Sequence, residues 1–434
     1  MKFYSSKNKQ ITADFEQALM TGLASDGGLF MPESFPSFSE DQLQTFSEQS
    51  FPVVAAQVAQ CFVGSSIREV DLQRICKEAY DFSVPFHALE ADQLVLELFH
   101  GPTAAFKDFA ARFMARCVEY FLLQKNQKKT LLVATSGDTG GAVGHAFRGM
   151  ENMQVFILYP SGGVSPLQEK QLTTLGQNVQ ALEVRGNFDD CQRMVKEAFM
   201  DQDFNDQINL MSANSINVGR ILPQSFYYFW TSLQLQKQFP GRKIVYSVPS
   251  GNLGNVTGGL MAKRMGAPID RFIMAQNTNH PFVDFLQTGS FDPGVSISTI
   301  SNAMDIGHPS NFYRIAELYK EDLEGLRKDA WGASFTDDQT RAAMKDVFEK
   351  YDYEMCPHTA VGYLGLQKYK QEVDESVLGV TVSTAHPGKF QELMVEVLGH
   401  EISLPERLQS VLTHDKIARI IEADLGSLKD TILT

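Results

Sequence analysis

Residues 130–147 read TLLVATSGDTGGAVGHAF, which is a short apolar run, a loop of small residues and a helix-forming segment, in that order. The same order recurs along the chain, because the apolar runs at 154–159, 179–184, 243–248 and 378–383 are each followed by a polar or glycine-containing loop and a helical period. Strands that alternate with helices predict parallel sheets of the doubly wound type. Such sheets bind ligands outside the carboxyl ends of their strands, so a functional site is expected at these loops.

The length of 434 residues exceeds what one simple hydrophobic core accommodates, so more than one domain is expected. Residues 1–90 have the pattern of a more helical N-terminal segment and lack the strand–helix alternation. We predict a smaller α/β domain over 91–225 and a larger one over 226–434, with a helical insertion at about 280–355. The predicted fold class is therefore α/β, with two doubly wound, mainly parallel domains and the N-terminal segment.

The composition is that of an ordinary globular protein with a formal net charge of −14. Nucleic acid and anionic membranes both require a basic surface, so neither is expected as a general partner. The five cysteines are scattered and form no CxxC pair, which is typical of a reduced compartment. Residues 1–15 lack the apolar core of a signal peptide, and no apolar run approaches the roughly 18 residues of a membrane span, so we expect a cytoplasmic protein.

A second informative stretch is ELFHGPTAAFKDFAARF at 97–113, which runs from a strand-like segment through a Gly-Pro break into a helix. When 106–122 is wound at about 100° per residue, the apolar side chains fall on one face and Asp108 falls on the opposite, polar face. Lys107 lies roughly 60° from the middle of the apolar face, an unusual place for a solvated charge. Either its stem covers apolar surface while the ammonium reaches water, or it is a desolvated, nucleophilic amine with a lowered pKa. The helix alone leaves both interpretations open.

Two loops combine glycine with small polar residues directly before a helix, where backbone N–H groups can face an anion. They are VATSGDTGGAVG at 133–144 and PSGNLGN at 249–255. Neither contains the GxGxxG fingerprint of dinucleotide sites or the GK[ST] ending of a nucleotide P-loop. Each loop can equally be a tight turn selected for packing alone.

Polar side chains also follow two further apolar runs. STAHPGKF at 383–390 places His386 near a strand end, and such a histidine is more often structural than catalytic. SANSINVGR at 212–220 supplies Asn214 and Arg220, and arginine is the natural partner of phosphate or carboxylate, although most arginines lie on the surface. The nine histidines form no HExxH motif or obvious metal cluster, and there is no GxSxG elbow, so neither a metal site nor a serine hydrolase is expected.

Together these segments resemble the motifs of the fold-type II pyridoxal-phosphate enzymes, and of the threonine synthase family in its long form in particular. GPTAAFKDF resembles the lysine motif, TSGDTG the substrate loop, PSGNLGN the cofactor-phosphate loop and STAHPGKF the C-terminal motif. GLASDGGLFMPESFP at 22–36 is similar to the N-terminal signature that separates the threonine synthase family from its relatives. The matches extend from residue 22 to about residue 390, which is most of the chain.

The resemblance implies pyridoxal 5'-phosphate as the cofactor, no metal, and a role for each site residue. Lys107 would hold the cofactor as a Schiff base and carry protons, and Thr384 would hydrogen-bond the pyridine nitrogen. The loop that would cradle the cofactor phosphate consists of Gly251, Asn252, Leu253, Gly254 and Asn255. The residues that would bracket the substrate carboxylate are Thr135, Ser136, Gly137 and Thr139.

Two further implied assignments concern charge. Asp138 would lie at the phenolic edge of the cofactor, where many fold-type II relatives have Asn, and a carboxylate there would need a proton or a neighbouring cation. Asn214 and Arg220 resemble the pair that grips the substrate's own phosphate, with Ser136 nearby. An anionic substrate is compatible with an acidic chain, because a few local donors are enough to hold it.

The reaction implied is the conversion of O-phospho-L-homoserine and water into L-threonine and phosphate, by γ-elimination of phosphate and addition of water at Cβ. This is the last step of threonine biosynthesis and is catalysed by a carbon–oxygen lyase, for which a monomer or small homo-oligomer is expected. One alternative is a related phospho-lyase whose product hydrolyses to 2-oxobutyrate and ammonia. Another is an inactive cofactor-binding protein, which the intact Lys107 and complete loops argue against.

Overall fold

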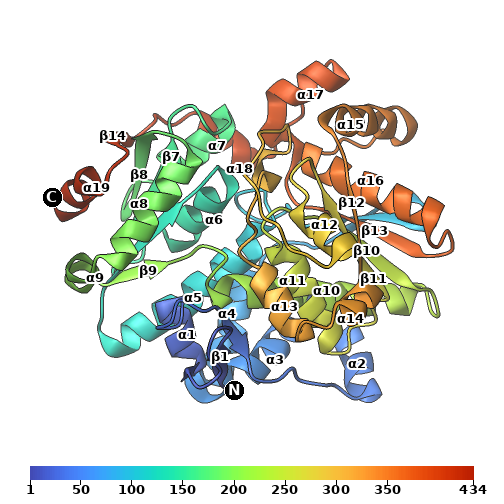
Figure 1. The fold of residues 1–434 in the computed structure, drawn as a ribbon, viewed down its shortest axis with the longest axis horizontal. Helices are drawn as coiled ribbons and strands as arrows, with labels where there is room; N and C mark the ends of the chain where they lie inside the picture. The colour runs from blue at the N-terminus through green and yellow to red at the C-terminus, as the bar shows by residue number, and fades with distance from the viewer.

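The computed structural model describes residues 1–434, and its backbone is organised around two sheets (Figure 1). The larger sheet has six strands in the order β12-β11-β10-β13-β5-β4, of which only β4 is antiparallel to its neighbour. The smaller sheet has five parallel strands in the order β14-β8-β7-β6-β9. The structure confirms the predicted α/β fold with two mainly parallel sheets.

The strands have the following bounds. The larger sheet contains β4 (Phe86–Glu90), β5 (Gln93–Glu97), β10 (Ile244–Pro249), β11 (Arg271–Gln276), β12 (Ala330–Ser334) and β13 (Leu378–Ser383). The smaller sheet contains β6 (Lys129–Ala134), β7 (Met153–Pro160), β8 (Val179–Arg185), β9 (Leu210–Ser212) and β14 (Ala418–Glu422). A small antiparallel sheet in the N-terminal segment contains β1 (Phe3–Ser5), β2 (Thr12–Ala13) and β3 (Phe30–Pro32).

The apolar runs that predicted strands form the central strands of both sheets. β10 and β13 are buried along their whole length, because helices cover parallel sheets on both faces. On β6 neighbouring side chains point to opposite faces, as the pleat requires. Leu132 packs with the core under α8 (Phe188–Met200), whereas Leu131 belongs to the main core that includes α6 (Asp138–Phe147).

Long helices connect the two sheets and cover them. α16 (Pro357–Glu372) packs on β10, β11 and β13, and α10 (Val218–Gln238) packs against α5 (Lys107–Lys125) and α11 (Gly254–Arg264). The remaining helices beyond the N-terminal segment are α7 (Pro166–Thr173), α9 (Gln202–Ile208), α12 (Pro281–Thr288), η2 (Asn302–Met304), α13 (Phe312–Tyr319), α14 (Leu323–Asp329), α15 (Asp337–Tyr351), η3 (Pro387–Phe390), α17 (Gln391–Leu398), α18 (Glu406–Leu412) and α19 (Leu425–Leu433). None of the helices combines the length and the apolar character that a membrane-spanning segment requires.

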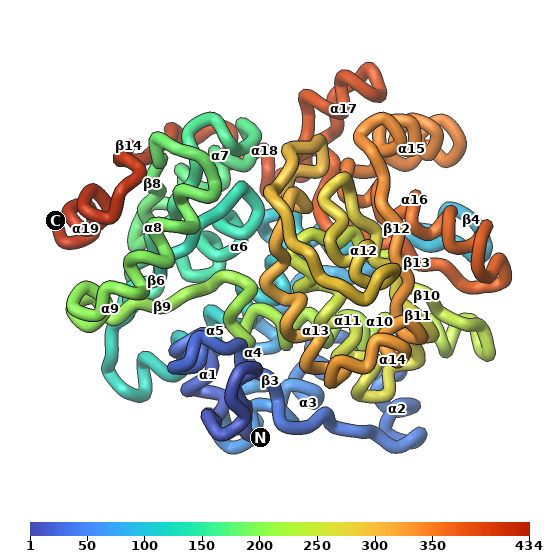
Figure 2. The backbone as a smooth tube through the Cα atoms, viewed as in Figure 1, coloured from blue at the N-terminus to red at the C-terminus, as the bar shows by residue number.

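The N-terminal segment is mainly helical, as expected, and packs beneath α5 and α10 (Figure 2). Its helices are α1 (Phe15–Thr21), α2 (Glu40–Ser47), α3 (Phe51–Val63), η1 (Gly64–Ser66) and α4 (Glu69–Ala79). Polar contacts supplement the apolar ones: the indole N–H of Trp230 donates to the carbonyl of Gln49 at 3.0 Å, and the amide of Asn217 donates to the carbonyl of Leu19 at 2.8 Å. The segment therefore supports the helices that form the floor of the region between the sheets.

The two sheets do not follow the contiguous ranges expected from the sequence. β5, which falls within 91–225, lies in the larger sheet beside β13, and β14, which falls within 226–434, pairs with β8 in the smaller sheet (Figure 2). The segment 280–355, expected to be helical, also contains β12, which extends the larger sheet at its edge. The domain boundaries at 90 and 225 stay a prediction, and the sheets themselves are built from segments on both sides of them.

Candidate active site

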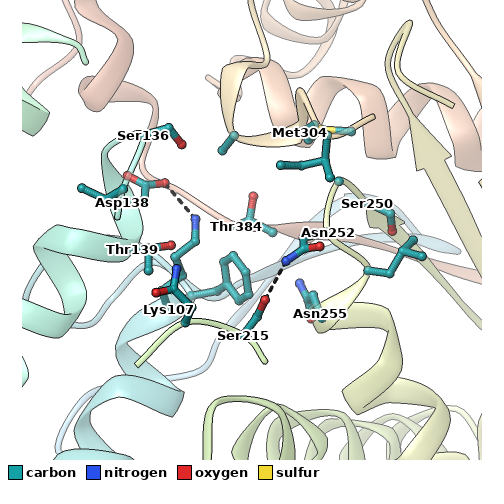
Figure 3. Close-up of a pocket in the computed structure, with 18 of the residues that line it drawn as sticks. Lys107, Ser136, Asp138, Thr139, Ser215, Ser250, Asn252, Asn255, Met304 and Thr384 are labelled. Atoms are coloured by element: carbon teal, nitrogen blue, oxygen red, sulfur yellow. Dashed lines mark hydrogen bonds and ion pairs between the residues drawn. The ribbon is translucent and has the colours of Figure 1, made fainter. Parts of the chain in front are cut away.

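One pocket lies between the two sheets at the carboxyl ends of their strands. Every site residue expected from the sequence lines it except Gly137. These residues come from the ends of β6, β9, β10 and β13 and from the first turns of α5, α6, α10 and α11 (Figure 3). Gly137 instead adopts a φ of 131°, and an added Cβ would meet the Gln168 side chain at 2.6 Å. It therefore lets α7 approach the substrate loop closely rather than lining the pocket.

Lys107 is the first residue of α5, and the turn before it is fastened to the end of β13. The backbone N–H of Phe106 donates to the carbonyl of Thr384 at 2.9 Å, and the N–H of His386 donates to the carbonyl of Ala104 at 3.1 Å. Ala104 has a φ of 54°, a conformation that residues other than glycine adopt rarely. These bonds fix where α5 begins and aim Lys107 at the pocket.

The helical pattern placed Asp108 on the polar, solvent-facing side of its helix, and the structure shows that this was wrong because Asp108 is buried. It is 1% exposed, and its carboxylate accepts hydrogen bonds from the backbone N–H of Thr103 at 2.9 Å and from the Thr103 hydroxyl at 2.7 Å. The carboxylate also contacts the space beside Gly101, where an added Cβ would lie 2.4 Å from it. Asp108 thus shapes the Gly-Pro turn that leads into Lys107.

The environment of Lys107 favours the second of the two interpretations left open by the sequence. Its side chain is 17% exposed and its Nζ lies 3.6 Å from a carboxylate oxygen of Asp138. Burial lowers the pKa of Lys107 below its ordinary value; the charge of Asp138 opposes this shift, and those of Lys389 and Arg220 add to it. A lysine in this setting is a stronger nucleophile near neutral pH than a solvated one.

Asp138 has the neighbouring cation that its position requires. Nζ of Lys389 lies 2.7 Å from Oδ1 of Asp138, and the amide of Gln168 donates to the same oxygen at 3.0 Å. Burial by itself would raise the pKa of Asp138, but the charges of Lys389 and Lys107 outweigh burial and hold it well below the usual range. Asp138 is therefore a carboxylate, not a carboxylic acid.

The loop at 249–255 brings backbone N–H groups to the pocket. α11 begins at Gly254, and Leu253 before it has a φ of 60°, which turns the chain sharply into the helix. Gly251 packs under the segment at η2 (Asn302–Met304), hereafter the covering loop, because an added Cβ would lie 2.7 Å from the Cα of Met304. The first-turn amides of a helix have no carbonyl partner within it, so the start of α11 is suited to an anion such as a phosphate.

The side chains of Asn255 and Asn252 differ in whether their hydrogen-bonding groups are already satisfied within the protein. The Asn255 carbonyl oxygen accepts hydrogen bonds from the hydroxyls of Tyr227 and Tyr228 at 2.5 and 2.9 Å, while its buried Nδ2 has no partner in the protein and lines the pocket. The Asn252 side chain is already occupied, since it donates to Ser215 at 2.6 Å and accepts from Ser310. Asn255 therefore offers an unsatisfied donor, whereas Asn252 fastens the loop to its surroundings.

Arg220 is a buried guanidinium without a carboxylate partner. It is 3% exposed, donates to the carbonyl of Ala213, and has an Nε with no hydrogen-bond partner. Burial lowers its pKa to about 10, so it still carries its charge at neutral pH. Asn214 lines the same part of the pocket and bonds through its amide to the carbonyl of Ala134 at 3.3 Å. An anion in the pocket would satisfy Arg220.

Two residues of the C-terminal motif have different places: Thr384 lines the pocket, whereas His386 does not. The Thr384 hydroxyl lines the pocket and has no hydrogen-bond partner within the chain (Figure 3). His386 lies outside the pocket, where its Nδ1 accepts from the N–H of Gly388 at 3.1 Å and caps η3. The structural interpretation of His386 therefore fits its geometry.

Sequence reasoning missed several residues of the site. Lys389 and Gln168 hold Asp138 from behind the pocket wall, and Ser215 and His358 line it. Lys389 lies within the quoted motif STAHPGKF, but the motif does not indicate that Lys389 is buried against Asp138. Burial lowers the pKa of His358 to about 4, and its Nε2 accepts from the N–H of Ala303, but no sequence pattern indicates this contact.

The residues present fit pyridoxal phosphate. The desolvated Lys107 lines the same pocket as the start of α11, where Asn255 has an unsatisfied donor, and the free hydroxyl of Thr384 lines it as well. The fold and this site define a pyridoxal-phosphate-dependent enzyme, and the family described as "Pyridoxal-phosphate dependent enzyme" matches residues 87–384. Families described as "Threonine synthase N terminus" and "Threonine synthase, C-terminal" match residues 2–80 and 359–432. The chain belongs to the threonine synthase family.

Similar proteins and crystal structures support this membership over the full length of the chain. Threonine synthase from Serratia marcescens is 39% identical over 433 residues, covering 100% of this chain and 99% of the relative; that from Haemophilus influenzae is 41% identical over 436 residues, covering 100% of both. The crystal structure of threonine synthase from Escherichia coli has a TM-score of 0.92 at 38% identity, covering 100% of this chain and 99% of that one. The pyridoxal-phosphate-bound enzyme from Brucella melitensis has a TM-score of 0.93 at 36% identity, covering 100% and 98%. The chain is a pyridoxal-phosphate-dependent lyase of this family.

Proposed function

We propose that this enzyme converts O-phospho-L-homoserine and water into L-threonine and phosphate in the pocket between the sheets. The observation that supports the proposal is that two groups suited to anions line the same pocket as one desolvated amine: the start of α11 for the cofactor phosphate, Arg220 for the substrate phosphate, and Lys107. A substrate with a phosphate of its own explains why a second buried cation without a carboxylate partner lies in the pocket.

The cofactor would be held by Lys107, by the loop Gly251–Asn255 and by the Thr384 hydroxyl. Within that loop, Gly251, Leu253 and Gly254 would contribute backbone shape and Asn255 its free amide, while Asn252 would act indirectly by holding Ser215 and Ser310. When bound, pyridoxal phosphate supplies the electron sink for carbanion chemistry. A neutral hydroxyl at Thr384 suits a moderate sink, because it imposes no proton on the pyridine nitrogen.

Lys107 would carry the protons. Its amine, whose pKa burial lowers, would take the proton from Cα of the substrate and return it at the end of the reaction. A proton then leaves Cβ and phosphate leaves Cγ, after which water adds at Cβ. Asp138 is held as a carboxylate beside Lys107 and would orient the amine, because Asp138 itself has no proton to give.

The substrate would be held at both ends. Thr135, Ser136, Gly137 and Thr139 form the turn that would bracket the substrate carboxylate, in which the Thr135 hydroxyl already accepts from the N–H groups of Gly137 and Gly140 at 2.9 Å. Asn214 and Arg220 would hold the phosphate, and Arg220 would favour its departure as negative charge grows on the leaving oxygen. We further propose a cytoplasmic enzyme that is monomeric or a small homo-oligomer.

Product analysis tests the proposal. The purified enzyme, loaded with pyridoxal phosphate, is incubated with O-phospho-L-homoserine, and phosphate, threonine and 2-oxobutyrate are measured together. We expect phosphate and threonine to rise in equal amounts. Equal amounts of phosphate and 2-oxobutyrate without threonine would establish the phospho-lyase alternative, and no phosphate at all would establish an inactive cofactor-binding protein.

A further inference from the structure

A second lysine is buried beside the site and has no role in the mechanism above. The Lys389 side chain is 0% exposed, and its Nζ contacts Oδ1 of Asp138 at 2.7 Å and the carbonyl of Thr103 at 3.0 Å. Burying a lysine is costly unless a partner of opposite charge accompanies it, and Asp138 is the carboxylate that Lys389 contacts. A lysine maintained at this cost, one carboxylate away from the reacting amine, requires an explanation.

The Asp138 carboxylate is shared between the two lysines. Its Oδ1 faces Lys389 and Gln168. Its Oδ2 faces Lys107 at 3.6 Å (Figure 3). The shorter distance, and therefore the stronger contact, is the one to Lys389. Asp138 is thus oriented by a cation on the side away from the pocket, and presents its less occupied oxygen to the pocket.

Lys389 is itself held by each element that forms this side of the site. Its backbone N–H donates to the carbonyl of His386 at 3.1 Å, and its carbonyl accepts from the Ser165 hydroxyl, the N-cap of α7, at 3.2 Å. Its side chain reaches the turn before Lys107 through the carbonyl of Thr103, which also accepts from the amide of Gln171 on α7 at 3.0 Å. A residue fastened at both backbone and side chain can set the position of Asp138 with precision.

We propose that Lys389 is a positioning residue for the reaction: it occupies one oxygen of Asp138, so that the other orients the Lys107 amine without holding a proton on it. The inference rests on the proposed role of Lys107 as the amine that carries protons. It assigns Lys389 no contact with substrate or cofactor, and it makes the charge of Lys389, rather than its bulk, the property that matters.

The direction of the effect follows from the charges around Lys107. The titratable and charged groups that face Lys107 are Asp138 on α6, Lys389 on η3, Arg220 on α10 and His358 on α16. Asp138 raises the pKa of Lys107, and Lys389 lowers it. Without Lys389, the full charge of Asp138 acts on Lys107, so Lys107 stays protonated to higher pH and less of the neutral amine is present at any given pH.

The test compares Lys389→Met, Lys389→Arg and Gln168→Met in the full-length holoenzyme. Lys389→Met is expected to move the acidic limb of the pH profile of kcat upward by about one pH unit or more, which lowers kcat roughly fivefold or more at the original midpoint while KM changes less. Lys389→Arg should restore most of the profile. Gln168→Met removes a hydrogen bond to Oδ1 of Asp138 but no charge. The acidic limb of its kcat profile should therefore keep the wild-type pH position, even if kcat itself falls.

A second readout does not depend on turnover. In cofactor-free protein, the rate at which acetic anhydride modifies Lys107, followed by peptide mass spectrometry over a pH series, reports how readily that amine loses its proton. Lys389→Met should shift this curve upward, and Lys370→Met serves as the matched control. Lys370, on α16, forms a 2.7 Å pair with Asp92 in the turn between β4 and β5, outside the pocket, so its loss should leave both the curve and kcat unchanged.

Several outcomes overturn the inference. These are an unchanged acidic limb in Lys389→Met, an equal shift in Gln168→Met, or no recovery in Lys389→Arg. If Lys389→Met does not fold, the double variant Lys389→Met with Asp138→Asn buries no unpaired charge and is used instead; it should lack the upward shift, and an upward shift there would also overturn the inference. Failure of the proposed function is recognised separately, because wild-type protein would then produce no threonine at any pH.

Discussion

The two walls of the pocket are built from different chemistry. The lysine wall consists of Lys107, Asp138 and Lys389, which hold one another by charge at 2.7 and 3.6 Å. The amide wall consists of the loop Gly251–Asn255 and the segment around Asn311, whose amide donates to the carbonyl of Asn252 at 3.0 Å. It contains hydrogen bonds and backbone N–H groups but no ion pair.

The difference separates two tasks. Hydrogen bonds between amides and hydroxyls keep their form across the physiological pH range, so the amide wall is shaped before any ligand arrives and should govern affinity for the cofactor. A balance between buried charges changes whenever one of them gains a proton, so the lysine wall should govern the rate and its pH dependence. Variants on each wall test this division.

The largest effect is expected on the lysine wall. Lys107→Ala removes the amine that would carry protons, so turnover should fall by at least about 1,000-fold. The amide wall is untouched, so this variant should still bind pyridoxal phosphate, now without the covalent attachment that borohydride reduction traps at Lys107. Steady-state kinetics and mass spectrometry of the reduced protein measure the two effects, and turnover within tenfold of wild type would remove Lys107 from the proposed mechanism.

Arg220→Lys tests the cation that lies between the two walls. A lysine cannot reproduce the planar guanidinium donors, so kcat/KM for the phosphorylated substrate should fall by roughly 100- to 1,000-fold. Arg314→Lys is the matched control, because Arg314 is equally buried but does not line the pocket; it bonds the carbonyls of Ser215 and Ile216 and the side chain of Asn311 from behind the amide wall. Arg314→Lys should lower the thermal stability while changing kcat/KM for the phosphorylated substrate little. If Arg314→Lys and Arg220→Lys lost kcat/KM equally, a specific phosphate contact at Arg220 would be excluded.

Asn255→Ala tests the amide wall. Losing one hydrogen bond to a charged phosphate should weaken cofactor binding by about 10- to 100-fold, whereas kcat at saturating cofactor should change little. The Tyr227 and Tyr228 hydroxyls also lose their acceptor, so a modest decrease in stability is expected. Tyr228→Phe removes one of those hydroxyls without touching the amide, so cofactor titrations of the two variants separate the effects. A large fall in kcat with unchanged affinity would reverse the roles given to the walls.

The smallest effect concerns His358, which supports the covering loop over the amide wall. Burial lowers its pKa to about 4, whereas an unfolded histidine titrates near 6.5, so below about pH 6.5 the unfolded state binds more protons. Stability should therefore fall as the pH drops from 6.5 toward 4, by up to about 1.4 kcal/mol per pH unit from this residue. Denaturant unfolding at several pH values should show a smaller slope in His358→Gln, and an identical slope would mean that other groups control it.

The sequence was sufficient for the central strands and most of the pocket, and the reasons are local. β6, β7, β8, β10 and β13 are continuous apolar runs, and their loops carry the site residues directly after the strand. β12 (AWGAS) is short and contains glycine, so it resembled part of a helical segment, and β14 gains its partner only from β8. Short edge strands are defined by the neighbour they pair with, which periodicity does not contain.

Buried charged side chains are harder to predict from the sequence than short edge strands. Asp108 is polar by composition and lies on the polar side of its helix, yet the turn at Thr103 buries it. Lys389 occurs within a recognised motif, but its importance depends on Asp138, which lies far away in the sequence. Whether a charged side chain is solvated or buried with a partner is decided by segments that meet only in the folded chain. Such residues are found from the structure and not from the pattern.

The fastening of the Lys107 turn also has a consequence for folding. Lys389 and Thr103 are 286 residues apart in sequence, and β5 pairs in the middle of the larger sheet with β13. Contacts of such long range form slowly, because a large loop must close before they stabilise anything. A nascent chain can thus complete many helices and much of the smaller sheet while its reactive lysine is still unplaced. The turn that positions Lys107 can therefore form only after the segment with β13 and Lys389 has joined the fold.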